Sequence, residues 1–368
     1  MKKLNAFVLA LPLALSLVAC SNNAAKETAK AETAAKTTET TATGAAAGAG
    51  ENAAAESPWE DGDTVTFEIG ARAGGGTDMM IRYVTQALGE LYPKVNFVVQ
   101  NYDVAEVGLQ AAANADPDGL TLTCVSVGNM SGYLAATSDT NPQEAFTIVA
   151  KFTPGGPQAL VANVDEPFNT MEELADYIRA NPKKINIGVS LGAVSHFSWL
   201  ETLNAIDPEL NNLVNYVQSG GEADKLTNIA SKSLDLVNCS LNNAIAYETD
   251  GKLKVLASIG PEIATKEETE KLLGVSLKDN YRSLPEMGID YSLNVGSYIA
   301  APSDTDPAIV EALNAAFRKL NDNDTYKNGI HAMGSFTGVN DVATSQESYK
   351  AECDDVLALM DKLGMNKR

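Results

Sequence analysis

The chain has 368 residues, with 48 Asp and Glu against 27 Lys and Arg, so its formal net charge is −21 at pH 7. Proteins that bind nucleic acid or anionic lipid by charge present clusters of basic side chains, and this composition argues against both. Only two histidines and no C-x-x-C motif are present, so we expect no metal site and no cofactor.

The first twenty residues have the pattern of a secretory signal. Lys2 and Lys3 precede an apolar run that ends in Leu-Val-Ala-Cys at residues 17–20, the order of a signal peptide with a lipid-acceptor cysteine. We therefore predict a lipoprotein signal peptide at residues 1–20, lipidation of Cys20, and an extracytoplasmic chain anchored to the cell membrane. The alternative is an ordinary signal peptide with an incidental cysteine.

Residues 21–57 are mostly Ala, Thr, Glu, Lys and Gly, with almost no large apolar side chain. Such a segment buries too little surface to offset the entropy lost on ordering, so we predict a disordered tether. About 310 residues remain, which is enough for two lobes with separate cores.

Three further cysteines, Cys124, Cys239 and Cys353, are widely spaced along the chain. An odd number at such spacing does not form a disulfide framework. Cys124 and Cys239 lie within apolar runs, which favours small buried side chains.

Strand and helix patterns alternate along the rest of the chain, as alternating apolar residues or as apolar residues at helical spacing. The predicted strands are 64–70, 94–101, 119–128, 158–163, 184–190, 213–219, 233–240, 252–260 and 297–301. The predicted helices are 79–92, 170–181, 195–205, 221–231, 306–320, 325–334 and 344–364. This alternation predicts an α/β protein with largely parallel sheets.

Several helix starts carry capping signals. The capping pairs are Thr170 with Glu173, Ser219 with Glu222, and Thr344 with Glu347, while Asp306 is expected at an N-cap before Pro307.

Residues 158–178 and 296–317 share one pattern: an apolar strand, an acidic loop containing proline, and a capped helix. We interpret them as two crossover strands that join two lobes. Lobe 1 would contain residues 58–160 and 300–368, and lobe 2 would contain residues 161–298. Lobes joined in this way close over a ligand in the cleft between them.

Three glycines stand between the first predicted strand and its helix, in Gly74-Gly75-Gly76-Thr77-Asp78. Glycine lets the backbone approach a ligand closely, and a helix N-terminus favours negative charge, so this loop is a candidate anion site. The alternative is a tight turn with Thr77 or Asp78 as the N-cap. The spacing matches neither a dinucleotide fingerprint nor a P-loop.

Two similar loops occur in the predicted second lobe. Residues 188–197 are rich in glycine and serine, with Ser195 placed to cap the next helix, and residues 219–221 are Ser-Gly-Gly before another helix. The carboxyl ends of parallel strands meet at one edge, so these loops and Gly74–Asp78 would face one cleft. Amides and hydroxyls would then hold an anion despite the acidic composition, because distant carboxylates are screened.

The same loop suggests a competing function. Gly188-Val-Ser190-Leu-Gly192 matches the G-x-S-x-G elbow of an α/β serine esterase, and Asp304 or Asp306 and then His331 follow in the required order. Against an esterase, His331 lies in a predicted helix and no HGGG-type segment precedes Ser190. A tethered adhesion or structural module is a third possibility, but it leaves the polar loops unexplained.

The ordered set of segments resembles one known family. "GARAGGGTDMMIRYVTQALGE", "INIGVSLGAVSHF", "NYVQSGGEADKLTNIASKSLDLV" and "LPEMGIDYS" occur in the order found in the substrate-binding proteins of tripartite tricarboxylate transporters, the Bug family. The resemblance runs from about residue 64 to 365. It implies a type II periplasmic-binding-protein fold, no enzyme activity, capture of a small di- or tricarboxylate or related organic anion, and delivery to a permease of one large and one small subunit.

The resemblance also implies ligand-binding positions. These are Gly74, Gly75, Gly76, Thr77 and Asp78 in the first loop; Ser190, Gly192, Ser195 and His196 in the second; and Ser126, Asn129, Ser219 and Asn238 between them. The chain departs from the family pattern at Asp103 and Glu106, where small residues are expected. These two acidic residues either face the pocket, where they would disfavour a highly charged ligand, or are solvated loop residues.

Three basic residues near these loops have open roles. His196 would pair with a carboxylate if protonated, or would simply pack at the helix start. Arg72 is a candidate ligand contact, whereas Arg82, further into the helix, is expected to form a surface or interlobe ion pair.

Overall fold

A computed structural model describes residues 57–260, 266–278, 281–291 and 295–368. The predicted signal peptide, Cys20 and the predicted tether as far as residue 56 lie outside these residues. Within the described ranges, no helix is long and apolar enough to cross a membrane. In the same ranges, no group of three or more His, Cys, Asp or Glu side chains is placed to hold a metal ion.

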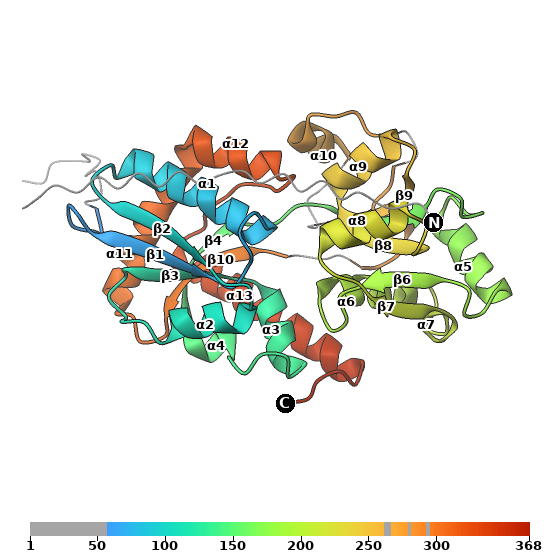
Figure 1. The fold of residues 1–368 in the computed structure, drawn as a ribbon, viewed down its shortest axis with the longest axis horizontal. Coiled ribbons are helices and arrows are strands. Elements are labelled where there is room, and N and C mark those ends of the chain that lie inside the picture. The colour runs from blue at the N-terminus through green and yellow to red at the C-terminus, as the bar shows by residue number, and fades with distance from the viewer. Residues whose placement is uncertain (1–56, 261–265, 279–280, 292–294) are drawn as a thin grey trace, which may run out of the picture. The chain divides into compact units, whose positions relative to one another are not determined.

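The described residues form two five-stranded sheets (Figure 1). The first has the order β2-β1-β3-β10-β4, built from β1 (Thr64–Ile69), β2 (Asn96–Asn101), β3 (Thr121–Val125), β4 (Phe146–Thr153) and β10 (Ser297–Pro302). The second has the order β7-β6-β8-β5-β9, built from β5 (Gln158–Asn163), β6 (Asn186–Val189), β7 (Asn215–Gln218), β8 (Leu236–Ser240) and β9 (Leu253–Ile259). The two sheets therefore have one topology.

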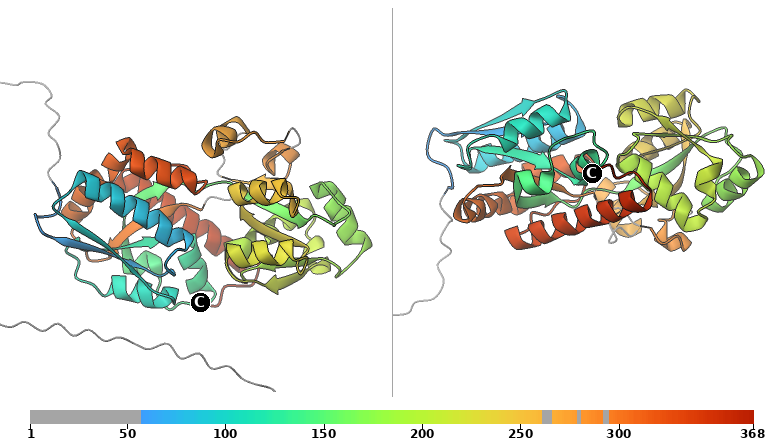
Figure 2. Two further views of the ribbon diagram at one scale, coloured as in Figure 1. Left: turned by 45° about the horizontal axis from the view of Figure 1, so that its top comes forward. Right: turned by 90° about the horizontal axis from the view of Figure 1, so that it is seen from below.

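Helices cover both faces of each sheet (Figures 1 and 2). On the first sheet, one face carries α1 (Gly76–Leu91), α11 (Pro307–Arg318) and α12 (Asp324–Ala332), and the other carries α2 (Ala105–Ala113), α3 (Val127–Leu134) and α13 (Val342–Lys362). On the second sheet, α5 (Met171–Ala180), α6 (Val194–Ile206) and α7 (Leu210–Leu213) share one core, and α8 (Glu222–Ala230) and α9 (Leu241–Thr249) share another. The short helices α4 (Pro142–Ala145) and α10 (Lys266–Leu273) and the 3-10 turns Pro285–Met287 and Lys319–Asp322 complete the described elements.

The strand directions correct the prediction of largely parallel sheets. β1 pairs in parallel with β2 and β3, but β10 runs antiparallel to β3 and β4. In the same way, β6 is parallel to β7 and β8, whereas β5 is antiparallel to β8 and β9. β5 is the first strand of the second sheet after the chain leaves the first, and β10 is the strand by which the chain returns to the first sheet. Each of them is antiparallel to the other four strands of its sheet.

The predicted crossover strands each lie within one sheet. β5 pairs only with β8 and β9, and β10 only with β3 and β4, so the predicted division at residue 160 falls within β5. The chain crosses through residues 154–157 and again between Ile259 and Ser297. A Cβ added to Gly156 would lie 1.9 Å from the Gly334 carbonyl oxygen, so the first crossing passes too close to neighbouring backbone for a side chain.

Apolar burial on one face explains the position of α1. Ile81, Val84 and Leu88 are fully buried, and their spacing places them on one side of the helix against Phe67 of β1. Trp59 closes this core at the N-terminal side, where its indole N–H donates to the Gly119 carbonyl oxygen at 3.2 Å.

The described cysteines are all free thiols. The prediction of burial is confirmed for Cys239, while Cys124 has intermediate exposure and packs against the first core. Burial raises the pKa of the Cys124 thiol to about 12, so this thiol stays neutral at physiological pH.

Helix starts bear out two capping predictions and correct two. Thr170 and Asp306 are N-caps. α13 begins earlier than predicted, because Asp341 is its N-cap and accepts a hydrogen bond from the Thr344 N–H at 2.9 Å. α8 has Gly221 rather than Ser219 at its N-cap.

Candidate ligand-binding site

The sheet topology gathers the predicted ligand loops at two equivalent edges. β1 and β3 are parallel neighbours, so residues 70–75 and Ser126 follow strands at the same carboxyl edge of the first sheet. β6, β7 and β8 end together at the carboxyl edge of the second sheet, next to residues 190–193 and 219–221.

The first crossing connects these two edges. β4 runs in the direction of β1, β2 and β3, because both β3 and β4 are antiparallel to β10. It therefore ends at the carboxyl edge of the first sheet, and β5, which is antiparallel to its neighbours, starts at the carboxyl edge of the second. Only residues 154–157 separate the two strands.

The glycine loop ends in a helix start without a side-chain cap. Gly75 is the N-cap of α1 and its cap position has no side-chain hydrogen bond, so Thr77 and Asp78 do not cap the helix, contrary to the tight-turn alternative. Gly74 has φ +79°, a conformation that favours glycine. Among the described residues, the amides of Gly76, Thr77 and Asp78 donate to no acceptor.

The Asp78 side chain braces this loop from inside. It is 1% exposed, and its carboxylate accepts from the Gly74 N–H at 2.7 Å, from Arg82 at 2.9 Å and from the Asn101 amide at 2.9 Å. Burial opposes its ionisation, but the hydrogen bonds from Arg82, Gly74 and Asn101 outweigh burial and lower its pKa. The carboxylate and the Arg82 guanidinium thus compensate each other, and the loop offers backbone amides rather than charge.

The β6–α6 loop repeats this arrangement with neutral groups. Ala193 is the N-cap of α6 and has no side-chain cap, contrary to the prediction that Ser195 caps the helix. Instead the Ser195 hydroxyl, nearly buried, accepts from the Ser190 N–H at 2.9 Å. Gly192 has φ +76°, and a Cβ added to it would lie 3.6 Å from the Ala135 side chain just after α3.

His196 is a buried neutral acceptor in this loop. Its Nδ1 accepts from the Gly192 N–H at 3.2 Å, and its ring stands edge-on to Tyr216 with the centroids 4.7 Å apart. Burial lowers the pKa of His196 to about 4. At neutral pH it therefore provides no cation for a ligand carboxylate, and its contact with the Gly192 amide shapes the loop.

Capping separates the carboxyl-edge helices from the others. α1, α2, α6, α8 and α9 follow strands at the carboxyl edges, and none of these helices has a side-chain cap. α4, α5, α11, α12 and α13 all have one, whereas the four-residue α7, which follows α6, does not. α5 and α11 follow the reversed strands β5 and β10, so they start at the opposite edges. Uncapped helix starts expose N–H donors and the positive end of the helix dipole.

α3 is the exception among the carboxyl-edge helices. The Ser126 hydroxyl accepts from the Gly128 N–H at 3.2 Å, and the Asn129 side-chain oxygen accepts from the Ser126 N–H at 2.9 Å, which is a capping box. The predicted ligand positions Ser126 and Asn129 thus cap the N-terminus of this helix.

Ser219 and Asn238 lie near a buried lysine that sequence reasoning missed. Ser219 and Asn238 are each 5% exposed, and Lys225 of α8 is 6% exposed, with its ammonium 3.5 Å from the Asn238 side-chain oxygen. Lys225 is four residues beyond Gly221 in a polar run, and nothing in that run distinguishes a buried lysine from a solvated one.

The geometry around Ser190 does not support an esterase. The Ser190 hydroxyl donates to the Gly220 carbonyl oxygen at 3.3 Å, and no histidine or carboxylate of the described chain bonds to it. His331 is exposed on α12 and contacts Thr337 at 3.3 Å, while Asp306 caps α11.

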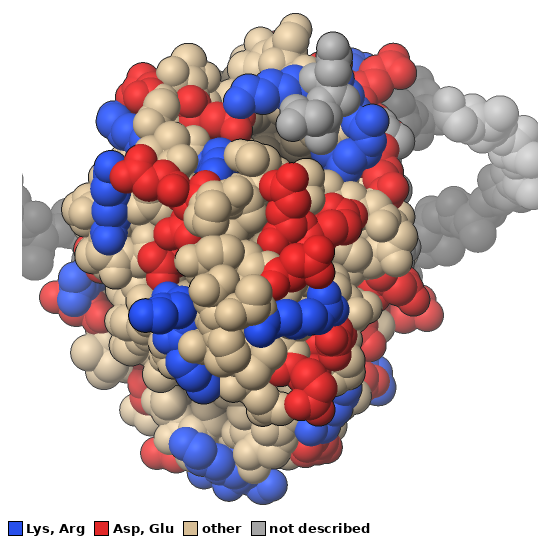
Figure 3. Space-filling view, turned by 90° about the vertical axis from the view of Figure 1, so that its right-hand side faces the viewer, with Lys and Arg blue, Asp and Glu red and all other residues tan. Residues whose placement is uncertain are grey.

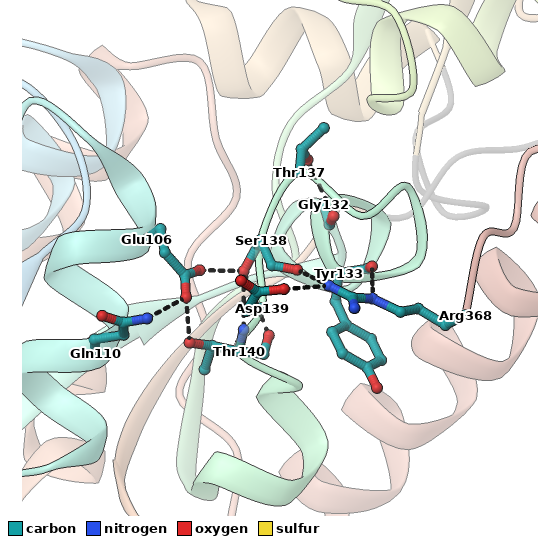
Figure 4. A network of polar contacts seen from close by, with 9 residues as sticks. All are labelled: Glu106, Gln110, Gly132, Tyr133, Thr137, Ser138, Asp139, Thr140 and Arg368. Carbon is teal, nitrogen blue, oxygen red and sulfur yellow. Dashed lines mark hydrogen bonds and ion pairs between the residues drawn. The ribbon is translucent and has the colours of Figure 1, made fainter.

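The two acidic departures from the family pattern pair with other side chains of the protein. Asp103 is exposed and lies 3.8 Å from Arg72, which is exposed as well. Glu106 accepts hydrogen bonds from Ser138, from Thr140 at 2.9 Å and from Gln110 at 2.7 Å (Figure 4). Burial raises the pKa of Glu106, but these hydrogen bonds outweigh burial and lower it.

The C-terminal residue joins the same network (Figure 4). Arg368 donates to the Tyr133 and Ser138 carbonyl oxygens and pairs with Asp139 at 2.7 Å. Together with Glu106, it fixes the loop that follows α3. Elsewhere the surface is mixed in charge, with acidic and basic side chains interspersed on the face in Figure 3.

Two mixed α/β sheets of one topology, joined by crossings and carrying uncapped loops at their carboxyl edges, define a periplasmic-binding-protein fold. The model of the tripartite tricarboxylate transporter family receptor matches residues 94–359, and the chain belongs to that family. The resemblance drawn from the sequence is confirmed.

The relatives agree with this assignment. A UPF0065 protein of Bordetella pertussis is 25% identical over 276 residues, covering 71% of this chain and 77% of the relative. A UPF0065 protein of Cupriavidus necator is 24% identical over 308 residues, covering 82% and 88%.

Solved structures share the fold. The periplasmic binding protein BugD superimposes with a TM-score of 0.66 at 21% identity, covering 83% of this chain and 99% of that one. Rpa4515 of R. palustris with adipate gives 0.67 at 23% identity, covering 82% and 97%. MatC of Rhodopseudomonas palustris with bound malate gives 0.64 at 20% identity, covering 81% and 98%.

Proposed function

We propose that the chain is an extracytoplasmic solute-binding lipoprotein that captures a small organic anion carrying carboxylates and delivers it to a tripartite tricarboxylate-type permease. The family consists of solute receptors rather than enzymes, and two solved relatives carry adipate and malate. A di- or tricarboxylate is therefore the ligand class we assign.

The observation that carries the proposal is the capping contrast. Side chains cap α4, α5, α11, α12 and α13, which do not follow a carboxyl-edge strand, whereas α1 and α6 start at Gly76 and Val194 with no side-chain cap. A carboxylate at either start would accept the N–H groups left without acceptors and would lie at the favourable end of the helix dipole.

Local neutrality supports binding of an anion by an acidic protein. Asp78, the carboxylate nearest the first loop, is compensated by Arg82 and by two further donors. The second loop contributes Ser190, Ser195 and a neutral His196. Carboxylates elsewhere on the surface act weakly, because ordinary salt screens charges over about 8–10 Å.

Closure of the two lobes over the ligand is the capture step that we propose. Residues 154–157 and 295–296 would bend as the ligand binds amides from both edges. The ligand drives closure only to the extent that it prefers the closed state. The closed form would be what the permease recognises, while Cys20 keeps the receptor at the membrane.

A thermal-shift panel on the purified full-length chain tests the ligand class. Malate, succinate, adipate and citrate are compared with glucose and putrescine as controls. A ligand at 100 times its Kd adds about 2.7 kcal/mol of stability, which shifts Tm by a few degrees. We expect a selective shift with one or more carboxylates.

Two results would contradict the proposal. A shift with glucose or putrescine but with no carboxylate would rule out the assigned ligand class. Acylation of Ser190 by an activated ester probe, if it is lost in Ser190→Ala, would support the competing esterase function instead.

A further inference from the structure

Lys225 is the one lysine of the described chain that is buried, and its ammonium is weakly paired. It is 6% exposed, and its one hydrogen bond, 3.5 Å to the Asn238 side-chain oxygen, is at the limit of such a contact. By contrast, Lys151 in the first lobe, whose side chain is 13% exposed, pairs with Glu352 at 2.8 Å. An ammonium with three donors is therefore left largely unsatisfied.

The groups around Lys225 do not supply a direct counterion. Glu222, one turn earlier on α8, attracts the ammonium but makes no ion pair with it within the described residues. One Glu222 oxygen instead accepts from the Ser240 N–H at 3.1 Å and from the Asn243 amide at 2.7 Å. Burial raises the pKa of Cys239, the other titratable neighbour, so its thiol stays neutral.

Lys225 lies at the edge that carries the second-lobe loops. Its neighbour Asn238 is on β8, directly before the uncapped start of α9 at Ser240. Its own helix begins uncapped at Gly221, and the adjacent Gly220 accepts from the Ser190 hydroxyl at 3.3 Å. The Asn238 amide group donates no hydrogen bond to any described residue.

We propose that Lys225 is the cation that pairs with a ligand carboxylate in the second lobe, with Asn238 donating to the same carboxylate. The inference rests on the proposed function and names the specificity-determining residue of that site. A buried charge is costly unless it is paired, and a ligand carboxylate would supply the missing partner. It would also give the second lobe a preference for anions that neutral hydroxyls alone do not provide.

The protonation state of the Lys225 ammonium makes this role measurable. Burial lowers the pKa of the Lys225 ammonium, and Glu222 and Cys239 only partly offset burial. A carboxylate beside the ammonium raises that pKa again, so binding takes up a proton at pH values above the lowered pKa. Affinity should fall as pH rises through the lowered pKa, at most about tenfold per pH unit.

The test compares the full-length wild type with Lys225→Met and Lys225→Gln by isothermal titration with the carboxylates of the panel. Lys254→Met is the matched control, because Lys254 is a partly buried lysine of the same lobe that donates to the Glu166 carbonyl oxygen and to Asn169. We expect about tenfold weaker binding or more in both Lys225 variants and no change in Lys254→Met. Titrations at a series of alkaline pH values, each in two buffers of different ionisation enthalpy, should show proton uptake in the wild type only.

The outcomes separate the two proposals. If the wild type binds a carboxylate and both Lys225 variants bind it with equal affinity and equal proton uptake, the role of Lys225 is overturned and the proposed function stands. If the wild type binds no carboxylate of the panel, both are overturned. Circular dichroism and Tm identify a variant that has lost its fold, and the smaller change Lys225→Gln then decides.

Discussion

The two sheets have the same strand order, but the ionisable side chains near their equivalent loops are paired differently. At the β1–α1 loop, Asp78 and Arg82 are fully paired, so the loop shows only neutral amides. At the second edge the loop side chains Ser195 and His196 are neutral, and a weakly paired cation, Lys225, contacts Asn238 of β8. One topology therefore carries two arrangements of charge, one with an internal ion pair and one with a weakly paired ammonium.

The largest expected effect is that of Asp78→Asn, which removes the carboxylate charge from the first loop. Asparagine keeps one acceptor oxygen, but it loses the charge that pairs with Arg82 and places an NH2 donor where three donors converge on the buried Asp78 carboxylate, so we expect the free energy of unfolding to fall by about 2–4 kcal/mol. Because the folded pKa of Asp78 is lowered, its contribution is present above its unfolded pKa and lost as pH falls through the lower folded value. Urea unfolding at pH 7 and below measures both effects.

Asp103→Asn is the matched control for this change. Asp103 is exposed and only 3.8 Å from an equally exposed Arg72, so we expect a change below about 0.5 kcal/mol. Equal losses in the two variants would show that the Asp78 network does not brace the loop.

Gly76→Val and Ser195→Ala compare the two loops as ligand sites. A Cβ at Gly76 meets nothing within 4 Å, so Gly76→Val should fold while its side chain blocks the amides at the start of α1. We expect carboxylate affinity to fall about tenfold or more. Ser195→Ala removes one hydroxyl donor from the second loop and should cost about 1 kcal/mol of binding free energy, roughly fivefold in affinity. Isothermal titration measures both.

Gly70→Ala is a control variant that disturbs the backbone of the first loop instead of blocking a ligand contact. A Cβ at Gly70 would lie 2.5 Å from the Ala105 carbonyl oxygen, so this variant should lose stability rather than affinity alone. Wild-type affinity in Gly76→Val would remove the first loop from the site.

The pH dependence of stability tests whether His196 is a buried neutral side chain in the second loop. Its folded pKa, about 4, is below the ordinary histidine value of 6.5 because the ring is buried. Between these values the unfolded chain binds more protons, so stability should fall as pH falls, by at most about 1.4 kcal/mol per pH unit. His196→Gln should flatten this part of the stability profile. His331→Gln, an exposed control, should change it less, and a steeper effect at His331 would contradict the assignment.

The smallest expected effect concerns the support of α3, which contacts the second-lobe helix α6. Arg368→Ala removes the hydrogen bonds to Tyr133 and Ser138 and the pair with Asp139. We expect at most about 1 kcal/mol of lost stability, because the group is partly exposed. Hydrogen exchange should increase at residues 137–140, and unchanged exchange there would show that the C-terminus does not hold this loop.

Much of the fold could be predicted from periodicity. The strands at 64–69 and 253–259 and the helices at 171–180 and 307–318 have strong apolar patterns and, for the helices, clear caps. The patterns missed β4, α2, α3, α4, α7, α9 and α10. The helices among these are short, four to nine residues each, and packing provides the stability that local propensity does not.

The sequence by itself determined that this is an acidic α/β protein with glycine- and serine-rich loops between strands and helices, because local composition and spacing carry that information. The family entered through the resemblance of an ordered set of segments, which the family model confirms. Only the tertiary structure decided that the sheets are mixed, that Asp78 and Glu106 brace loops, that His196 is neutral, and that Lys225 is buried with a weak partner. The physical reason is that burial and pairing set the state of an ionisable group, and both depend on residues brought together from distant parts of the chain.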